Sequence, residues 1–219
     1  MNEAVAALWG PRGRNALAYL HGRGLTDETI KAAGLGWVLD AMVPTKDDDR
    51  RFLYSGVTIP WRDGKRLTRV KIRRFPNPDI TPKYAEAYSD RPRIYPDPAV
   101  IRIGEPLVIC EGEFDAMLLG QLLPEASVIT LGSAGARTDL AVLSRMLASP
   151  RWFAALDADK AGDSAASKFP ARAIRVRPPD KDWGEVHREG ANRIRYYWGR
   201  YLSMSQSWEQ LESLRWGPP

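Results

Sequence analysis

The sequence predicts an α/β protein built around a parallel sheet, and two observations lead to this prediction. From Pro106 onward, short apolar runs alternate with segments of helical periodicity, which is the pattern of βαβ units with right-handed crossovers. The length of 219 residues is enough for one good core and a smaller attached subdomain. We therefore expect a parallel sheet flanked by helices, a smaller N-terminal α+β subdomain and a helical C-terminal tail.

The N-terminal part, residues 1–103, is expected to hold short helices followed by a β-hairpin. Apolar residues recur at helical spacing within residues 14–34, and glycines interrupt the run. Residues 56–61 and 67–73 have the composition of two strands around a tight turn at residues 62–65.

The middle part, residues 104–183, holds the predicted parallel sheet. Its strands are expected at residues 107–110, 127–131, 152–156 and 173–176, and its helices at residues 115–123, 139–148 and 164–169. The last part, residues 184–219, is amphipathic and rich in aromatic side chains, so we expect helices that pack back on the body.

Positive charge gathers in the predicted hairpin. The net charge of +5 is by itself a weak pointer to nucleic acid, but residues 62–74 are basic almost without acidic relief. Because side chains alternate along a strand, Arg69, Lys71 and Arg73 fall on one face of the hairpin. We expect this face to be too basic for core and to lie open to solvent or to phosphates.

Cysteine and histidine are too few for a zinc site or a disulfide framework. Cys110 is the single cysteine, and His21 and His187 are the two histidines. We therefore expect Cys110 to be a buried small side chain and any bound metal to be oxygen-bound. The N-terminus lacks the features of a secretory signal, and no uninterrupted apolar run is long enough to span a bilayer, so we expect a cytoplasmic protein with no membrane partner.

Acidic residues follow three of the four predicted strands. Glu111 follows the first strand, Asp157 and Asp159 follow the third, and Asp182 follows the fourth. Because the carboxyl ends of parallel strands meet at one edge of a sheet, these side chains should lie close together. Grouped carboxylates repel one another unless a cation neutralises them, and oxygen ligands of this kind suit Mg²⁺ or Mn²⁺. The sequence therefore predicts a metal site at this edge.

Several neighbouring features have simpler explanations than chemistry. The turn at residues 132–135 is as consistent with an ordinary strand-to-helix turn as with a phosphate-binding loop. We interpret Asp139 as a helix N-cap or a first-turn acid, Glu113 and Asp180 as solvated, and Asp163 as an acid that complements a helix N-terminus.

The acidic motifs have a familiar order. The pattern E-G-x-x-D at residues 111–115, followed after another strand by D-x-D-x-x-G at residues 157–162, resembles the Toprim domain of bacterial primases, type IA and II topoisomerases and several small nucleases. The likeness to the catalytic core of DnaG-type and phage or plasmid primases extends over roughly residues 14 to 198. It rests on residues 18–26, the strand segments 56–61 and 69–73, the element Pro82-Lys83-Tyr84, and the closing motif within residues 181–190.

The resemblance implies roles for the acids. Glu111 is expected to act as a general acid or base or as a metal ligand, and Asp157 and Asp159 to hold Mg²⁺ or Mn²⁺. Asp115 and Asp182 are expected to complete the catalytic and metal-binding pocket.

The same resemblance implies contacts to template or nucleotide phosphates from Arg69, Lys71, Arg73, Lys83 and Lys160. A zinc module for template engagement and a helicase motor are not found in this sequence, so a partner that supplies them in trans is expected if the protein starts primers.

The function that the resemblance favours is a primase-like nucleotidyltransferase of plasmid, phage or mobile-element type, which synthesises primers on single-stranded DNA during replication. A Toprim nuclease that hydrolyses phosphodiester bonds, or a non-catalytic nucleic-acid-binding partner subunit, remains the alternative. Template preference, the choice between NTP and dNTP, the oligomeric state and any helicase partner are open at this point.

Overall fold

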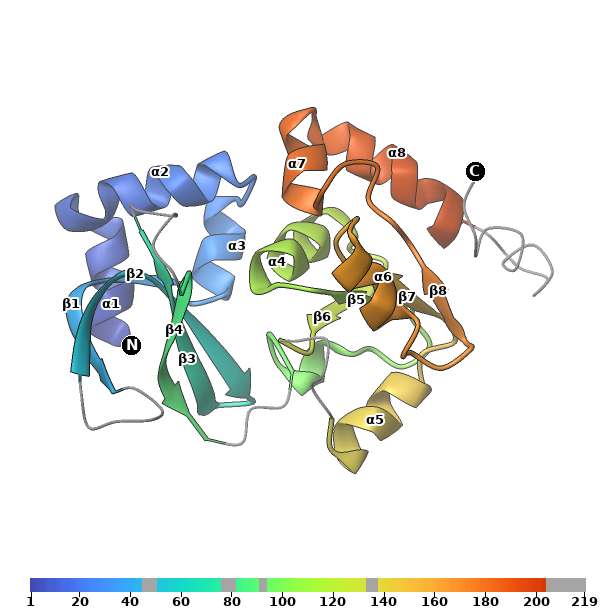
Figure 1. The fold of residues 1–219 in the computed structure, drawn as a ribbon, viewed down its shortest axis with the longest axis horizontal. Helices are drawn as coiled ribbons and strands as arrows, with labels where there is room; N and C mark the ends of the chain where they lie inside the picture. Colours follow the sequence, from blue (N-terminus) through green and yellow to red (C-terminus); the bar gives the residue numbers. More distant parts are fainter. Residues whose placement is uncertain (45–50, 76–81, 91–93, 133–137, 204–219) are drawn as a thin grey trace. The chain divides into compact units, whose positions relative to one another are not determined.

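The computed structural model of the chain divides into two compact units, Met1–Pro92 and Arg93–Pro219 (Figure 1). The residues that it describes are 1–44, 51–75, 82–90, 94–132 and 138–203. Two expected features lie partly outside them: the turn at residues 132–135 and the end of the aromatic tail.

The first unit joins three helices to an antiparallel sheet. The helices are α1 (Asn2–Trp9), α2 (Arg14–Gly22) and α3 (Asp27–Ala32), and the short 3₁₀ turn η1 (Pro11–Gly13) links the first two. The strands, in their spatial order, are β1 (Gly36–Pro44), β2 (Arg51–Asp63), β3 (Arg66–Arg74) and β4 (Tyr84–Ser89). The α+β composition agrees with the prediction for this part of the chain.

Strand β2 is the centre of the first unit. It pairs with β1 on one side and β3 on the other, and its residues 56–61 are buried on both faces. The predicted hairpin is present as β2 and β3, and Gly64 supplies the positive φ of +60° that the tight turn requires.

The second unit is a four-stranded parallel sheet with helices on both faces. Its strands, in spatial order, are β6 (Ser127–Thr130), β5 (Leu107–Cys110), β7 (Trp152–Ala155) and β8 (Ala173–Arg175). Its helices are α4 (Glu113–Leu122), α5 (Leu140–Leu147), α6 (Lys160–Ala166), α7 (Trp183–Arg188) and α8 (Ala191–Leu202), and the 3₁₀ turn η2 (Pro98–Val100) precedes the sheet.

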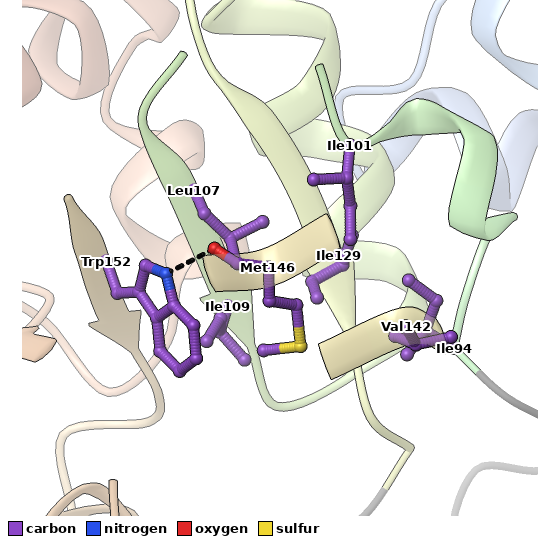
Figure 2. Close-up of a cluster of buried hydrophobic side chains, with 8 residues drawn as sticks. All are labelled: Ile94, Ile101, Leu107, Ile109, Ile129, Val142, Met146 and Trp152. Carbon is purple, nitrogen blue, oxygen red and sulfur yellow. Dashed lines mark hydrogen bonds between the residues drawn. The ribbon is translucent and has the colours of Figure 1, made fainter. Parts of the chain in front are cut away.

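One face of this sheet packs against α5 (Figure 2). Leu107 and Ile109 of β5 contribute to this core, and the indole Nε1 of Trp152 donates to the carbonyl of Met146 at 2.7 Å. Residues 94–101 also belong to it, because Ile94 and Ile101 are buried in the same cluster. The division between the units therefore lies after Pro92, rather than at the expected position after residue 103.

The opposite face packs against α4, α7 and α8. Phe153 lies against Trp198 of α8 with ring centroids 5.7 Å apart, and Nε1 of Trp183 donates to the carbonyl of Ala155 at 3.0 Å. Figure 1 shows α5 and α8 on opposite sides of the sheet. The expected packing of the C-terminal helices on the body is therefore present, and α7 and α8 share one unit with the sheet.

Helix α6 begins at Lys160, whereas the sequence suggested a helix over residues 164–169. The earlier start has a local cause: Oδ1 of Asp159 accepts a hydrogen bond from the amide of Gly162 at 2.7 Å and so caps the helix. The longest helix in the described part of the chain, α8, has 12 residues, and none there has the length and apolar character needed to cross a membrane.

Candidate metal and phosphate site

The order of the strands in the second unit reverses between β5 and β7. The chain passes from β5 to β6 on one side and then to β7 on the other side of β5. The crevice at the carboxyl ends of two strands that flank such a reversal is the usual place for a ligand in a parallel sheet. Glu111 follows β5 directly, and Asp157 lies two residues after β7. Both acids therefore lie at the reversal point.

Glu111 and Asp157 approach each other there. The amide nitrogen of Asp157 lies 3.4 Å from Oε2 of Glu111, a long hydrogen bond. The pairing of Cys110 with Ala155 sets this proximity, because it aligns the ends of the two strands.

The pKa of Asp157 is raised from its ordinary value of 3.8 to about 6. Burial of the carboxyl is the largest cause, and the negative charges of Glu111, Asp182 and Asp159 add to it, while Lys181 opposes them. Three of the acids that the sequence singled out therefore act on the fourth through space, as the common edge of the sheet predicts.

Asp159 and Asp182 each use one carboxylate oxygen to cap a helix. Oδ1 of Asp159 caps α6, and Oδ1 of Asp182 accepts from the amide of Glu185 at 2.8 Å at the start of α7. The caps fix both side chains in position and hold two helix N-termini beside the acidic loops, where the helix dipoles favour negative charge.

The donor set fits a hard divalent cation in its chemistry. In the described part of the chain, no three Asp, Glu, His or Cys side chains are grouped closely enough to hold a metal ion by themselves. Mg²⁺ does not require such a group, because it is commonly bound by one or two carboxylates together with waters and substrate phosphates. The acids around Asp157 therefore suit an open Mg²⁺ or Mn²⁺ site better than a closed protein cage.

Asp115 lies in the first turn of α4, partly buried on the same side of the sheet. Burial raises the pKa of the Cys110 thiol, and the negative charges of Asp115 and Asp157 raise it further. Cys110 is therefore a protonated, buried side chain, as expected, and Asp115 is near enough to the strand ends to affect it.

Two expectations about neighbouring acids were wrong. Glu113 is only 2% exposed, because it lies in the first turn of α4 where that helix packs into the unit, whereas we expected it to be solvated. Asp180 is partly buried and accepts from Nη1 of Arg193 at 2.7 Å. Of the two interpretations of Asp139, the N-cap is confirmed, since its Oδ1 accepts from the amide of Val142 and caps α5.

A close backbone contact explains why the D-x-D-x-x-G pattern ends in a glycine, Gly162. A Cβ atom at this position would lie 2.2 Å from the carbonyl oxygen of Asp157. Any side chain would therefore push α6 away from the loop that holds Asp157, and only glycine permits this close approach of the two backbones.

In the first unit, three cations and two aromatic rings form a row that we call the basic row: Arg69, Trp61, Lys71, Tyr84 and Arg73. The guanidinium carbon of Arg69 lies 4.7 Å from the centroid of Trp61, and Nζ of Lys71 lies 5.4 Å from both rings. The guanidinium carbon of Arg73 lies 5.0 Å from the centroid of Tyr84. Each cation therefore lies within the range of a cation–π interaction.

The expectation that this face is too basic for core and lies open was wrong for Arg69 and Arg73. Arg73 is only 7% exposed, and the side chain of Arg69 is 19% exposed beside Glu86, whose Oε2 lies 2.8 Å from its Nε. The aliphatic stems of the arginines and the aromatic rings cover one another, so the face is packed despite its charge. The buried Nε atoms of both arginines have no aligned hydrogen-bond partner among the described residues, and for Arg69 the Glu86 contact is an ion pair only.

The two other predicted phosphate contacts are exposed. Lys83 precedes β4 in the first unit, and Lys160 is the first residue of α6 in the second unit. Lys160 therefore starts the helix that Asp159 caps, next to the acidic group. The basic row and Lys83 belong to the first unit, and the acidic group belongs to the second.

Sequence reasoning missed Arg175, Arg177 and their link to Asp163. Arg175 ends β8, and its Nη2 donates to the carbonyl of Asp157 at 2.6 Å. Asp163, expected only to complement a helix N-terminus, forms ion pairs with both arginines. The available signal was a pair of arginines two residues apart at the end of an otherwise apolar run, because a buried charge needs a partner.

Comparison with known proteins agrees with this geometry. A family model described as Toprim-like matches residues 108–187. No curated protein sequence matches the chain.

Several solved structures share the fold of the chain. The E. coli primase catalytic core is 19% identical, with 91% of this chain and 77% of that chain covered and a TM-score of 0.66. The RNA polymerase domain of Mycobacterium tuberculosis primase DnaG in complex with double-stranded DNA is 16% identical, with the same coverages and a TM-score of 0.68. A DnaG primase catalytic domain bound to single-stranded DNA is 20% identical, with the same coverages and a TM-score of 0.65. The predicted resemblance and fold class are thereby confirmed.

Proposed function

We propose that this chain, which carries a Toprim-like domain within the fold of DnaG-type primase cores, is a primase-like nucleotidyltransferase that extends a nucleic-acid strand on single-stranded DNA. The observation that supports this most directly is the meeting of Glu111 and Asp157 at the strand-order reversal. Asp159 and Asp182 surround this pair electrostatically.

In the proposed reaction, a strand's 3′-oxygen attacks the α-phosphorus of a nucleoside triphosphate, its proton leaves, and pyrophosphate is released. Glu111 is exposed at the reversal point, so its carboxylate either accepts this proton or holds a metal ion. Asp157 and Asp159 are the proposed ligands of Mg²⁺ or Mn²⁺, and Asp115 and Asp182 complete the negative field. When bound, divalent ions neutralise the triphosphate and promote loss of the proton from the 3′-hydroxyl.

The raised pKa of Asp157 fits this role. A carboxyl that is disfavoured as an anion by burial and by three neighbouring acids gains more from a cation than an isolated one does. The acids around Asp157 therefore repel one another in the absence of a cation, and a bound Mg²⁺ or Mn²⁺ would reduce that repulsion.

The basic row and Lys83 are the proposed contacts to template or nucleotide phosphates. Arg69, Lys71 and Arg73 are held by Trp61 and Tyr84, so their positive charges lie at fixed positions, with Arg73 buried. Lys83 and Lys160 are exposed and can reach phosphates without rearrangement of the fold.

The experiment combines the protein with labelled NTPs or dNTPs, single-stranded DNA and Mg²⁺ or Mn²⁺, and scores both extension and cleavage. A primed and an unprimed template separate extension from initiation. We expect metal-dependent extension of the primed strand with release of pyrophosphate. Metal-dependent cleavage without extension would show the nuclease alternative instead, and binding of DNA with neither product would show a non-catalytic partner subunit.

A further inference from the structure

We propose that Arg175 is a positioning residue for the acidic loop at residues 157–159, with Asp163 and Arg177 as its supports. The metal-binding role of this loop rests on the proposed function, whereas the hydrogen bonds that Arg175 makes to the loop do not. Arg175 lies at the carboxyl end of β8, the edge strand next to β7. Its side chain is largely buried, which is unusual for a charged group without a specific task.

The guanidinium group of Arg175 binds backbone oxygens where β7 runs into the acidic loop. Nη1 donates to the carbonyls of Leu156 at 2.7 Å and Ala154 at 3.2 Å, and Nη2 donates to the carbonyl of Asp157 at 2.6 Å. The carbonyls of Leu156 and Asp157 lie beyond the last ladder position of β7 and β8, whereas the carbonyl of Ala154 also accepts from the amide of Val176 at 3.0 Å within the ladder. Arg175 thus continues the hydrogen bonding of the sheet into the loop.

Asp163 fixes the orientation of this guanidinium group. Its Oδ1 accepts from Nε of Arg175 at 3.2 Å and from Nη2 at 3.0 Å. Its Oδ2 accepts from Nη1 of Arg177 at 2.5 Å. One carboxylate on α6 therefore orients two arginines, and α6 is the helix that Asp159 caps.

Arg177 holds the next peptide of the loop. Its Nη2 donates to the carbonyl of Ala158 at 2.8 Å, and the amide of Ala158 donates to the carbonyl of Lys181 at 2.9 Å. The carbonyls of residues 156–158 are thus all bound by the two arginines. Fixing these three peptides fixes the directions in which the side chains of Asp157 and Asp159 leave the backbone.

The arginines act through backbone oxygens and leave the acidic side chains to a ligand. Their bonds in the described structure run to carbonyls and to Asp163, rather than to the carboxylates of Asp157 or Asp159. The positive charges of the two arginines therefore contact the backbone of the loop and not its carboxylates. The fork of donors on arginine is needed for this, because the ammonium group of lysine cannot reach several divergent acceptors from one position.

The test compares Arg175→Met with Arg172→Met, a matched control at the residue just before the same strand. Arg172 precedes β8, lies over the ring of Trp152 and donates to the carbonyl of Ser149 at 2.7 Å. It too is an arginine that binds backbone oxygen, but at the amino end of the sheet. Both variants are expected to lose thermal stability, so a loss of stability alone does not distinguish the positioning role.

The distinguishing readout is amide hydrogen exchange in the metal-free protein. Arg175→Met is expected to speed exchange at the amides of Ala158 and Gly162 at least tenfold relative to Arg172→Met, and Arg175→Lys is expected not to restore protection. Equal exchange at these amides in the two methionine variants would overturn the proposal. Asp163→Asn, at a half-exposed position, serves as a milder variant, and we expect it to speed exchange at the same two amides.

A second arm measures Mn²⁺ binding by calorimetry. Arg175→Met is expected to weaken binding by 10- to 100-fold, the usual effect of losing a group that orients metal ligands, while Arg172→Met retains wild-type affinity. If the wild-type protein binds no Mn²⁺, the proposed metal chemistry fails, and the exchange experiment still decides the role of Arg175. Equal affinity in both variants would contradict the link between the loop and the metal.

Discussion

The amide nitrogen of Asp157 lies 3.4 Å from Oε2 of Glu111, across the boundary where the strand order of the parallel sheet reverses. The two residues are 46 positions apart in the chain and meet because β5 and β7 are paired in register. The negative charge of Glu111 adds to the raised pKa of Asp157, which makes the site sensitive to pH, to cations and to the backbone that holds it.

The pKa of Asp157 predicts how the stability of the metal-free protein depends on pH. Its value of about 6 in the fold, against the ordinary 3.8, means that the folded state binds this proton more tightly than the unfolded chain does. Ionisation of Asp157 between about pH 4 and pH 6 therefore destabilises the fold. Asp157→Asn should match the wild type near pH 4 and be more stable at pH 7. The expected gain in the free energy of unfolding is on the order of 1 kcal/mol once solvent screening is considered, and the melting temperature rises with it.

Scanning calorimetry in EDTA at both pH values measures this difference. Millimolar Mg²⁺ or Mn²⁺ at pH 7 should then raise the melting temperature of the wild type more than that of Asp157→Asn, because the ion binds the folded state. A constant difference between the two proteins from pH 4 to pH 7 would contradict the raised pKa.

Gly162→Ala should destabilise the second unit, because its Cβ would lie 2.2 Å from the carbonyl oxygen of Asp157. We expect a loss of at least about 2 kcal/mol in the free energy of unfolding. Gly199→Ala is the matched control: Gly199 also lies in a helix, and a Cβ there meets no atom within 4 Å. That change should be neutral or stabilise by up to about 1 kcal/mol. Chemical denaturation measures both, and similar effects would mean that the contact with Asp157 is unimportant.

Lys83→Gln should weaken binding of single-stranded DNA and reduce the steepness of its salt dependence by about one unit, the effect of losing one phosphate contact. Lys83 is suitable because it is exposed, whereas Arg73 is buried and its removal would also disturb the fold. Lys31→Gln removes the same charge from α3, where Lys31 lies over the ring of Trp9, and should leave the slope unchanged. Fluorescence anisotropy over a range of salt concentrations measures both slopes, and identical slopes would assign Lys83 to the solvated surface.

The sequence predicted the sheet and the acidic edge because both follow from local patterns. Apolar runs such as residues 107–110 mark buried strands, and the residues that follow parallel strands share one edge. The strand pattern alone was therefore enough to place the acids at one edge, whereas the meeting of Glu111 with Asp157 depends on the pairing of β5 with β7. The start of α6 was also readable, since Asp159 is a good N-cap residue, but the apolar period favoured a later start.

The burial of charged groups could not be predicted in the same way, because it depends on distant partners. Arg73 is buried by a ring from β4, and Glu113 is buried because α4 packs closely at its N-terminus. Arg175 binds the carbonyls of residues 154, 156 and 157, and backbone oxygens leave no mark in a sequence. Charge alone therefore predicts exposure to solvent for side chains that the fold buries.

The most direct test of the proposed function is the rate of primer extension by Glu111→Gln with single-stranded template and Mg²⁺ or Mn²⁺. Glutamine keeps the shape of Glu111 but can neither accept a proton at neutral pH nor supply a full negative charge. We expect extension to fall by roughly a hundredfold or more, while the melting temperature and DNA binding stay near wild type. Glu125→Gln, an exposed change just before β6, should extend normally. Extension by Glu111→Gln at the wild-type rate would contradict the assignment of this acidic site as the catalytic centre.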